Sequence, residues 1–295
     1  MISTLLVPLD GSEAAEAALG YAALIPSQRV RLVRVEPKSS GIIPLGTPEE
    51  AAWQAEVEAE ARSYLERRAE RLRRQGREID IVVLRGDPAD GILGSAVDAD
   101  LIVMTTHGRG AGSRALFGSV ADRVARHATA PTLVVRADGR ADAPPQVSRI
   151  IVPLDGSTLA TRALGPATEL ASLLGVPMHL VRVIDVDALR GTVQAGARAG
   201  AAYARAQEET RRRAVEDLDV QARTPRAQTV NTTTEVRIGN PAAELLEVIG
   251  PTDLVVMTTH GRGGIRRWLL GSVADKLVHQ ASAPVLLIRA GAPER

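Results

Sequence analysis

The feature that most constrains this chain is an internal repeat. Three pairs of segments correspond in the same order: LVPLDGS at 6–12 with IVPLDGS at 151–157, DLIVMTTHGRG at 100–110 with DLVVMTTHGRG at 253–263, and GSVADRVARHATAPTLVVR at 118–136 with GSVADKLVHQASAPVLLIR at 271–289. The offset between the copies grows from 145 residues at the first pair to 153 at the third. A repeat of roughly 140 residues is too long for a solenoid unit, so the sequence predicts a duplicated domain.

The repeat also predicts where one domain ends and the next begins. Between the copies lies DGRADAPPQV, a short polar segment rich in proline and glycine, as linkers are. We therefore expect a first domain at 1–137, a linker at 138–147 and a second domain at 148–290. A length of 295 residues suits two domains of ordinary size.

Apolar runs in each copy alternate with longer amphipathic stretches. In the first copy we expect strands at 2–9, 30–35, 79–84, 101–105 and 132–135. We expect helices at 12–25 and 49–76, and two more that begin at Asp87-Pro88 and Gly118-Ser119. Continuous apolar runs are typical of strands buried on both faces, and such alternation predicts a parallel sheet. The predicted fold is α/β: two tandem Rossmann-like domains, each a five-stranded parallel sheet with helices on both faces.

The composition argues against several classes of function. The net charge is +1, which gives no field for nucleic acid or an acidic membrane, and aromatic residues make up only 2% of the chain. The chain has no cysteine, and no apolar run reaches the length of a membrane span. We expect a cytoplasmic protein that binds neither nucleic acid nor membrane.

The chemistry-bearing pattern is a glycine-rich loop after the fourth strand of each copy. It reads Thr105-Thr106-His107-Gly108-Arg109-Gly110 and then Gly118-Ser119, and it recurs from Thr258 to Ser272. Glycines let a backbone approach a ligand closely, and amides at a helix N-terminus bind phosphate. In a doubly wound sheet, ligands bind beyond the carboxyl ends of the strands, where the strand order reverses.

Other chemistries fit less well. No P-loop or GxGxxG pattern is present. His107 and His260 have no carboxylate or cysteine nearby in the sequence, so we assign no catalytic residue and no metal ligand.

Together these residues resemble the universal stress protein family, whose fourth strand is followed by Gly-x2-Gly-x9-Gly-[Ser/Thr]. Gly108 with Gly118-Ser119, and Gly261 with Gly271-Ser272, match the last elements of that motif. The family's Asp at the end of the first strand corresponds to Asp10 and Asp155. The first glycine of the motif is replaced by Thr105 and Thr258. The resemblance covers nearly the whole chain and implies HUP-type domains.

The resemblance further implies that each copy binds ATP, with ADP and AMP as alternatives, and that Mg²⁺ is held through the phosphates. The implied binding residues of the first copy are Asp10, Val35, Thr105, Gly108, Arg109, Gly118, Ser119 and Val120. Those of the second copy are Asp155, Val183, Thr258, Gly261, Arg262, Gly271, Ser272 and Val273. Arginine pairs well with phosphate oxygens, which suits Arg109 and Arg262.

Three functions remain open at this point. The leading one is an ATP-binding stress or signalling module without substantial turnover. The second is a slow ATP hydrolase, and the third is a dimerisation module that binds no nucleotide, which the threonines at 105 and 258 keep open. The apolar last strand of each copy predicts an intramolecular pseudo-dimer through edge pairing, and association into a homodimer is left open.

Overall fold

The computed structural model divides the chain into two compact units, unit 1 (Met1–Pro145 with Glu294–Arg295) and unit 2 (Gln146–Pro293). It describes residues 2–38, 47–106, 117–136, 145–187, 199–224, 229–259 and 270–289. Residues 138–144 of the expected linker lie outside the described residues.

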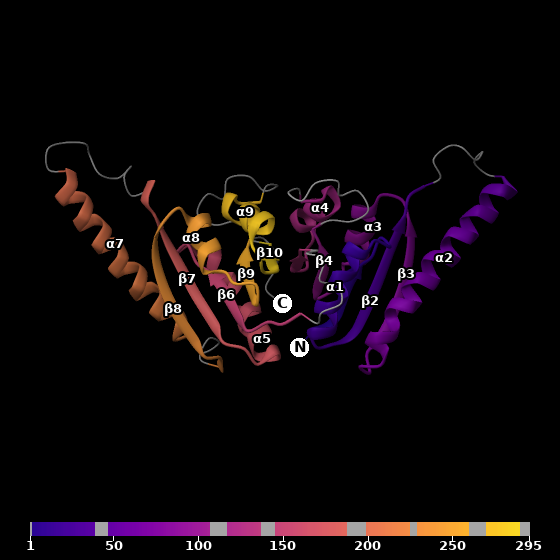
Figure 1. Cartoon of the computed structure of the whole chain (residues 1–295), viewed down its shortest axis with the longest axis horizontal. Coiled ribbons are helices and arrows are strands. Elements are labelled where there is room, and N and C mark those ends of the chain that lie inside the picture. Colours follow the sequence, from indigo (N-terminus) through magenta and orange to yellow (C-terminus); the bar gives the residue numbers. More distant parts are fainter. Residues whose placement is uncertain are drawn as a thin grey trace. The chain divides into compact units, whose positions relative to one another are not determined.

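Unit 1 alternates strands and helices along the chain (Figure 1). The elements are β1 (Ile2–Pro8), α1 (Glu13–Leu24), β2 (Ser27–Glu36), α2 (Pro48–Arg73), β3 (Glu78–Arg85), α3 (Pro88–Ser95), β4 (Leu101–Thr105), α4 (Ser119–His127) and β5 (Thr132–Val135). All nine predicted elements are present, which confirms the predicted alternation.

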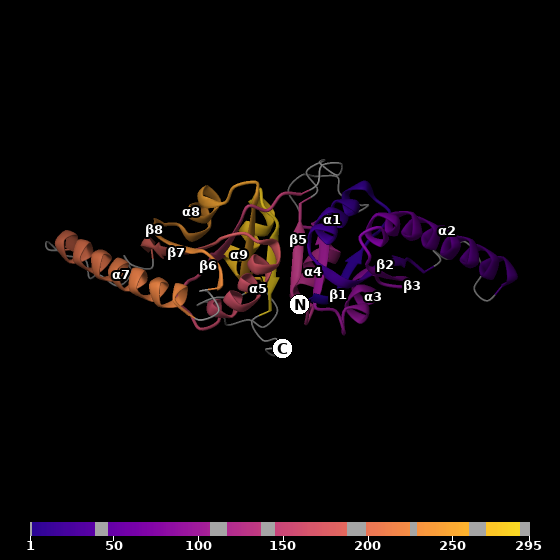
Figure 2. The same ribbon diagram turned by 90° about the horizontal axis from the view of Figure 1, so that it is seen from below.

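The strands of unit 1 form a parallel sheet in the order β3-β2-β1-β4-β5. The order reverses between β1 and β4, the switch point of a doubly wound sheet. Helices α1 and α2 lie on one face of the sheet and α3 on the other, as Figure 2 shows. The predicted fold class is confirmed.

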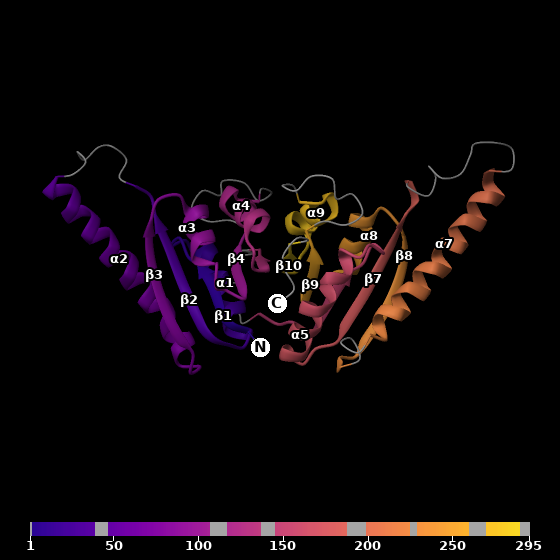
Figure 3. The same ribbon diagram turned by 180° about the vertical axis from the view of Figure 1, so that it is seen from behind.

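Unit 2 repeats this arrangement. Its elements are β6 (Arg149–Pro153), η1 (Ala160–Ala163), α5 (Leu164–Leu174), β7 (Met178–Asp185), α7 (Ala199–Ala222), β8 (Thr232–Gly239), α8 (Pro241–Val248), β9 (Asp253–Thr258), α9 (Ser272–Gln280) and β10 (Val285–Ile288). The parallel order is β10-β9-β6-β7-β8. The long helix α7 runs beside β8, as is clear in Figure 3.

The core of unit 1 under α3 and α4 is built from the apolar runs that predicted the strands. Leu6, Ile102 and Val124 in this cluster are fully buried. Burial of such side chains contributes roughly 1.5–3 kcal/mol each, which fixes the strand ends and the loops that follow them. In the part of the chain that the structure describes, no helix is long and apolar enough to cross a membrane.

Most element boundaries lie within one residue of the sequence expectation, and two differ from it by three residues. Strand β2 begins at Ser27 because Arg29 and Arg31 pair with acidic side chains of β3, which extends the ladder through a polar stretch. Helix α2 ends at Arg73, where a tight turn brings the Gly76 N–H onto the Arg73 carbonyl at 2.9 Å.

Candidate functional site

The turn between β1 and α1 is built by the sequence Asp10-Gly11-Ser12. Oδ1 of Asp10 accepts hydrogen bonds from the Ser12 backbone N–H at 2.9 Å and from the Ser12 hydroxyl at 2.6 Å. Ser12 in turn caps α1 by accepting from the Ala15 N–H at 3.2 Å. Gly11 sits at φ +87°, a conformation that a side chain would strain. The carboxylate of Asp10 is thereby held at the carboxyl end of β1.

Unit 2 builds the same turn from the same residues. Oδ1 of Asp155 accepts from the Ser157 N–H at 2.9 Å, and the Ser157 hydroxyl accepts from the Ala160 N–H at 3.2 Å. Gly156 lies at φ +81°. One local difference is that the helix after this turn begins with the short 3-10 segment η1 before α5. Each unit therefore presents a fixed aspartate at the switch point of its sheet.

The helix that follows the glycine-rich loop starts without a side-chain cap. Gly118 is the N-cap of α4 and Gly271 that of α9, and neither start has a side-chain cap hydrogen bond. The other helices of unit 1 are capped by Ser12, Thr47 and Asp87. The first N–H groups of a helix have no intrahelical acceptor, and they carry the positive end of the helix dipole. The uncapped starts of α4 and α9 are suited to an anion.

Backbone hydrogen bonds fix where each uncapped helix begins. The Gly118 N–H donates to the Thr106 carbonyl at 2.7 Å, and the Gly271 N–H donates to the Thr259 carbonyl at 2.8 Å. Gly118 lies at φ −61° and Gly271 at the same angle, so neither glycine is required by backbone conformation. Their value at these positions is the absence of a side chain beside the helix start. The donors left for a ligand begin at Ser119 and Ser272.

The threonines that replace the first glycine of the motif end their strands. Thr105 is the last residue of β4 and 7% exposed, and Thr258 is the last residue of β9 and 5% exposed. In register, Thr105 pairs with Val135 and Thr258 with Ile288. Both side chains are buried at the edge of the site, where the strand gives way to the loop.

Val35 and Val183 lie near the carboxyl ends of β2 and β7. The Val35 side chain packs on α3, because a Cβ built at Gly91 would come within 2.8 Å of the Val35 Cγ2. The part of Val35 and Val183 in binding a nucleotide stays a prediction.

The structure brings Asp10, Thr105, Gly118, Ser119 and Val120 to the carboxyl ends of β1 and β4. It does the same for their counterparts in unit 2, Asp155, Thr258, Gly271, Ser272 and Val273. Gly108, Arg109, Gly261 and Arg262 lie outside the described residues, as do His107 and His260. Among the described residues, no group of three or more His, Cys, Asp or Glu side chains could hold a metal ion.

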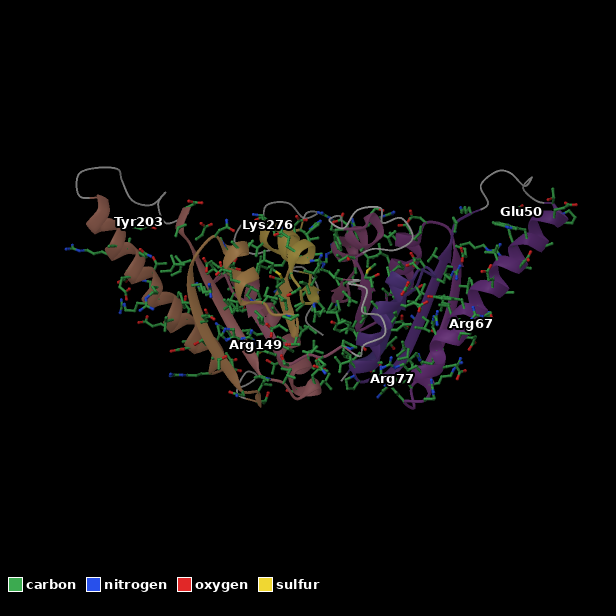
Figure 4. All side chains as sticks on the ribbon, viewed as in Figure 1. Glu50, Arg67, Arg77, Arg149, Tyr203 and Lys276 are labelled. Atoms are coloured by element: carbon green, nitrogen blue, oxygen red, sulfur yellow. The ribbon has the colours of Figure 1, made fainter. Side chains whose placement is uncertain are left out.

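Sequence reasoning missed an ionic contact beside the site of unit 1. Arg123 of α4 pairs with Asp87, the cap of α3, at 2.9 Å and also with Asp90. This contact ties the uncapped helix to its neighbour. In unit 2 the matched residue is Lys276 of α9, whose position Figure 4 labels, and the cap of α8 is the neutral Asn240. The spacing gave no signal for this pair, because its members come from different helices.

The fold and the site define a duplicated, doubly wound α/β protein with an anion-suited helix start at each switch point. The sequence model of the universal stress protein family matches residues 1–136 and 146–289. The chain belongs to the universal stress protein family, with two family domains in tandem.

Relatives with curated descriptions agree with this assignment. A universal stress protein of Mycobacterium tuberculosis (strain H37Rv) is 32% identical over 194 residues, 65% of this chain. That match spans only 62% of the relative's own length. A second universal stress protein of the same strain is 29% identical, covering 97% of this chain and 94% of the relative. The crystal structure of a universal stress protein from Archaeoglobus fulgidus is similar in fold, with a TM-score of 0.71, 20% identity and 98% coverage of both chains.

Proposed function

We propose that each unit binds ATP, or another adenine nucleotide, with Mg²⁺ held through the phosphates, and that the protein acts in stress response or signalling without substantial turnover. The observation that carries the proposal is the pairing, in both units, of a fixed aspartate with an uncapped helix start at the switch point. A nucleotide has matching groups, since its phosphates are anions and its ribose hydroxyls donate hydrogen bonds.

The residues divide this work by chemistry. Asp10 and Asp155 are acceptors that orient the ribose, next to the backbone of Val35 and Val183. The N–H groups at the starts of α4 and α9 hold the phosphates, with the hydroxyls of Ser119 and Ser272 beside them. Mg²⁺ supplies charge neutralisation on the phosphates. Buried Thr105 and Thr258 lie at the base of the site and keep the loop start on the sheet.

The alternative of an ATP hydrolase has less support. Hydrolysis calls for a group that orients or deprotonates water, and Oδ1 of the aspartate at each described site is already taken up by its own turn. We therefore favour nucleotide binding as the activity.

Assembly and location form part of the same proposal. The last strand of each unit's sheet is an apolar edge, TLVV in β5 and VLLI in β10, and proteins usually cover such edges. We propose that the units pair as a pseudo-dimer in the cytoplasm. Light scattering on residues 1–137 alone tests this pairing: self-association supports it, and a monomer at high concentration contradicts it.

Nucleotide binding is tested by heating the purified chain and identifying what is released, followed by titration calorimetry with MgATP, ADP and AMP. Release of an adenine nucleotide, or binding heat at millimolar concentrations or below, supports the proposal. No released nucleotide and no heat with any of the three would contradict it and would favour the dimerisation module.

A further inference from the structure

Unit 2 contains a cavity on the sheet face that carries α5 and α7. Its volume is about 210 Å³, and it is open to solvent on one side. It opens between the turn after β6, strand β7 and helix α7, and its lining includes Leu154, Ser157, Thr161, Arg182, Asp217 and Leu218. The described structure of unit 2 thus leaves space for a small molecule where the sheet and its long helix face each other.

The corresponding place in unit 1 is filled by a network around a tyrosine. Tyr64 of α2 is buried, and its hydroxyl donates to Glu16 of α1 at 3.1 Å. Arg68 pairs with the same glutamate at 2.8 Å. Arg34 of β2 lies over the Tyr64 ring, 5.2 Å from its centroid, and pairs with buried Glu36 at 2.5 Å. In unit 1, therefore, Glu36 neutralises Arg34 and the Tyr64 ring packs against it.

Arg34 has a counterpart in unit 2, Arg182, but the acidic neighbours of Arg34 have no counterpart there. Pro8 pairs with Val33 and Pro153 with Val181, so Arg34 and Arg182 occupy matched positions on the neighbouring strand. At the 145-residue offset of the first segments, Thr161 stands where unit 1 has Glu16. Ile184 of β7 likewise stands where unit 1 has Glu36. Unit 2 keeps the cation and loses both carboxylates.

Arg182 retains one acidic partner, and that partner is loosely held. The Arg182 side chain is 10% exposed, and its Nη1 donates to Asp217 Oδ2 at 2.7 Å. The Asp217 side chain is 63% exposed, and an ion pair to such a group is worth little. Within the described residues, no other hydrogen bond of the Arg182 guanidinium is seen. A guanidinium offers five N–H donors, and Arg182 is one of the residues that line the cavity.

We propose that this cavity is a second binding site, specific to unit 2, for a small molecule bearing a carboxylate or a phosphate monoester on a short aliphatic body. The oxyanion takes the place of Asp217 on Arg182, as a two-pronged hydrogen-bonded pair. The hydroxyl of Thr158 lies at the same cavity, whereas that of Thr161 donates to the Thr158 carbonyl at 2.9 Å. Buried Leu154 and Leu218 contact the aliphatic part.

The site is separate from the proposed nucleotide site. Arg182 and Val183 are successive residues of one strand, so their side chains leave the sheet on opposite faces. The cavity adjoins the proposed nucleotide site at the turn after β6, where Leu154, Gly156 and Ser157 lie beside Asp155. The inference therefore stands whether or not unit 2 binds ATP.

The test is an NMR titration of the full chain, labelled with ¹⁵N-arginine, with butyrate and with glycerol 3-phosphate. Butyramide, which has the shape of butyrate without its charge, is the control ligand. We expect the charged probes to shift the Arg182 side-chain signal and butyramide to leave it unmoved. A stronger response to one charged probe assigns the site to carboxylates or to phosphates.

Three variants sharpen the test, with circular dichroism as the check on folding. Arg182→Ala removes the cation and Thr161→Phe fills the cavity. Each should weaken binding of the charged probes at least tenfold. Asp217→Asn removes the competing carboxylate at an exposed position and should strengthen binding several-fold. Arg212→Ala, at an exposed position of the same helix, is the matched control and should change nothing.

The proposal is overturned if neither charged probe moves the Arg182 signal, or if Asp217→Asn leaves the affinity unchanged or lowers it. The titration is repeated with MgATP present. Displacement of butyrate by ATP would assign the response to the nucleotide site and would also overturn a separate site. An unchanged affinity for butyrate supports a separate site, even if ATP itself fails to bind.

Discussion

The two units agree at one end of the sheet and differ along one of its faces. At the carboxyl ends, the Asp-Gly-Ser turn and the glycine-capped helix recur with hydrogen bonds that match to within 0.1 Å. On the face under the long helix, unit 1 is filled by Tyr64 and its charged neighbours, whereas unit 2 has a cavity at Arg182. The difference teaches that duplication kept the geometry of the candidate site while the helix packing diverged.

The largest effect on the free energy of unfolding is expected at Tyr64, which fills the space under the long helix of unit 1. Tyr64→Ala should lower the free energy of unfolding of unit 1 by about 3–5 kcal/mol, because it removes a buried aromatic ring and its hydrogen bond to Glu16. Hydrogen exchange of the α2 and β2 amides measures this. Val215→Ala, at a more exposed position of α7, is the matched control with an effect within about 0.5 kcal/mol. Equal effects at the two positions would remove the contrast between the units.

The two arginine pairs should differ in their contribution to stability. Glu36→Gln leaves Arg34 buried without its carboxylate, and we expect a loss of about 3 kcal/mol in unit 1. Asp217→Asn removes an exposed partner of Arg182, and we expect a loss below about 1 kcal/mol in unit 2. Urea unfolding of both variants compares them. A larger loss for Asp217→Asn would show that the second pair is not loosely held.

Where the units agree, matched variants should cost about the same. Ser12→Ala and Ser157→Ala each remove a side chain that accepts an N–H at 3.2 Å at the start of the following helix. Loss of such a cap costs about 1 kcal/mol. Thermal unfolding of the two variants checks this, and a clear effect in one unit only would contradict the common role of the turn.

The smallest expected effect is on the stability of unit 2 at acidic pH. The hydrogen bond from His179, reinforced by Arg237, holds the pKa of Glu235 below its usual value. The folded unit therefore binds the proton less readily than the unfolded chain does. The resulting stability is fully present above the unfolded-state pKa of a glutamate and is lost as the pH falls through the lower folded-state pKa. We expect Glu235→Gln to flatten the acidic limb of unit 2's melting profile, and an unaltered limb would exclude this linkage.

Much of the fold could be predicted from the sequence because its signals are local. Continuous apolar runs such as that of β4 predicted the strands, and Ser12 and Asp87 predicted helix starts that the structure confirms. The start of β2 could not be predicted this way, because ion pairs with β3 extend it through polar residues.

The candidate site was predictable to the same extent. Its aspartates and glycine N-caps lie in the motifs that both copies share, so comparison of the two copies identifies them. The cavity of unit 2 was not predictable, because it depends on side chains missing beside Arg182 from elements far apart in sequence. The contact of Arg123 with Asp87 and Asp90 escaped prediction for the same reason.

The central claim is that the repeated end of each sheet is a nucleotide site, and the stoichiometry of ATP binding tests it most directly. Titration calorimetry of the full chain with MgATP should give two sites. Gly118→Val and Gly271→Val each place a branched side chain beside a helix start and should leave one site, with circular dichroism unchanged. No binding to the unaltered chain, or two sites in both folded variants, would contradict the account.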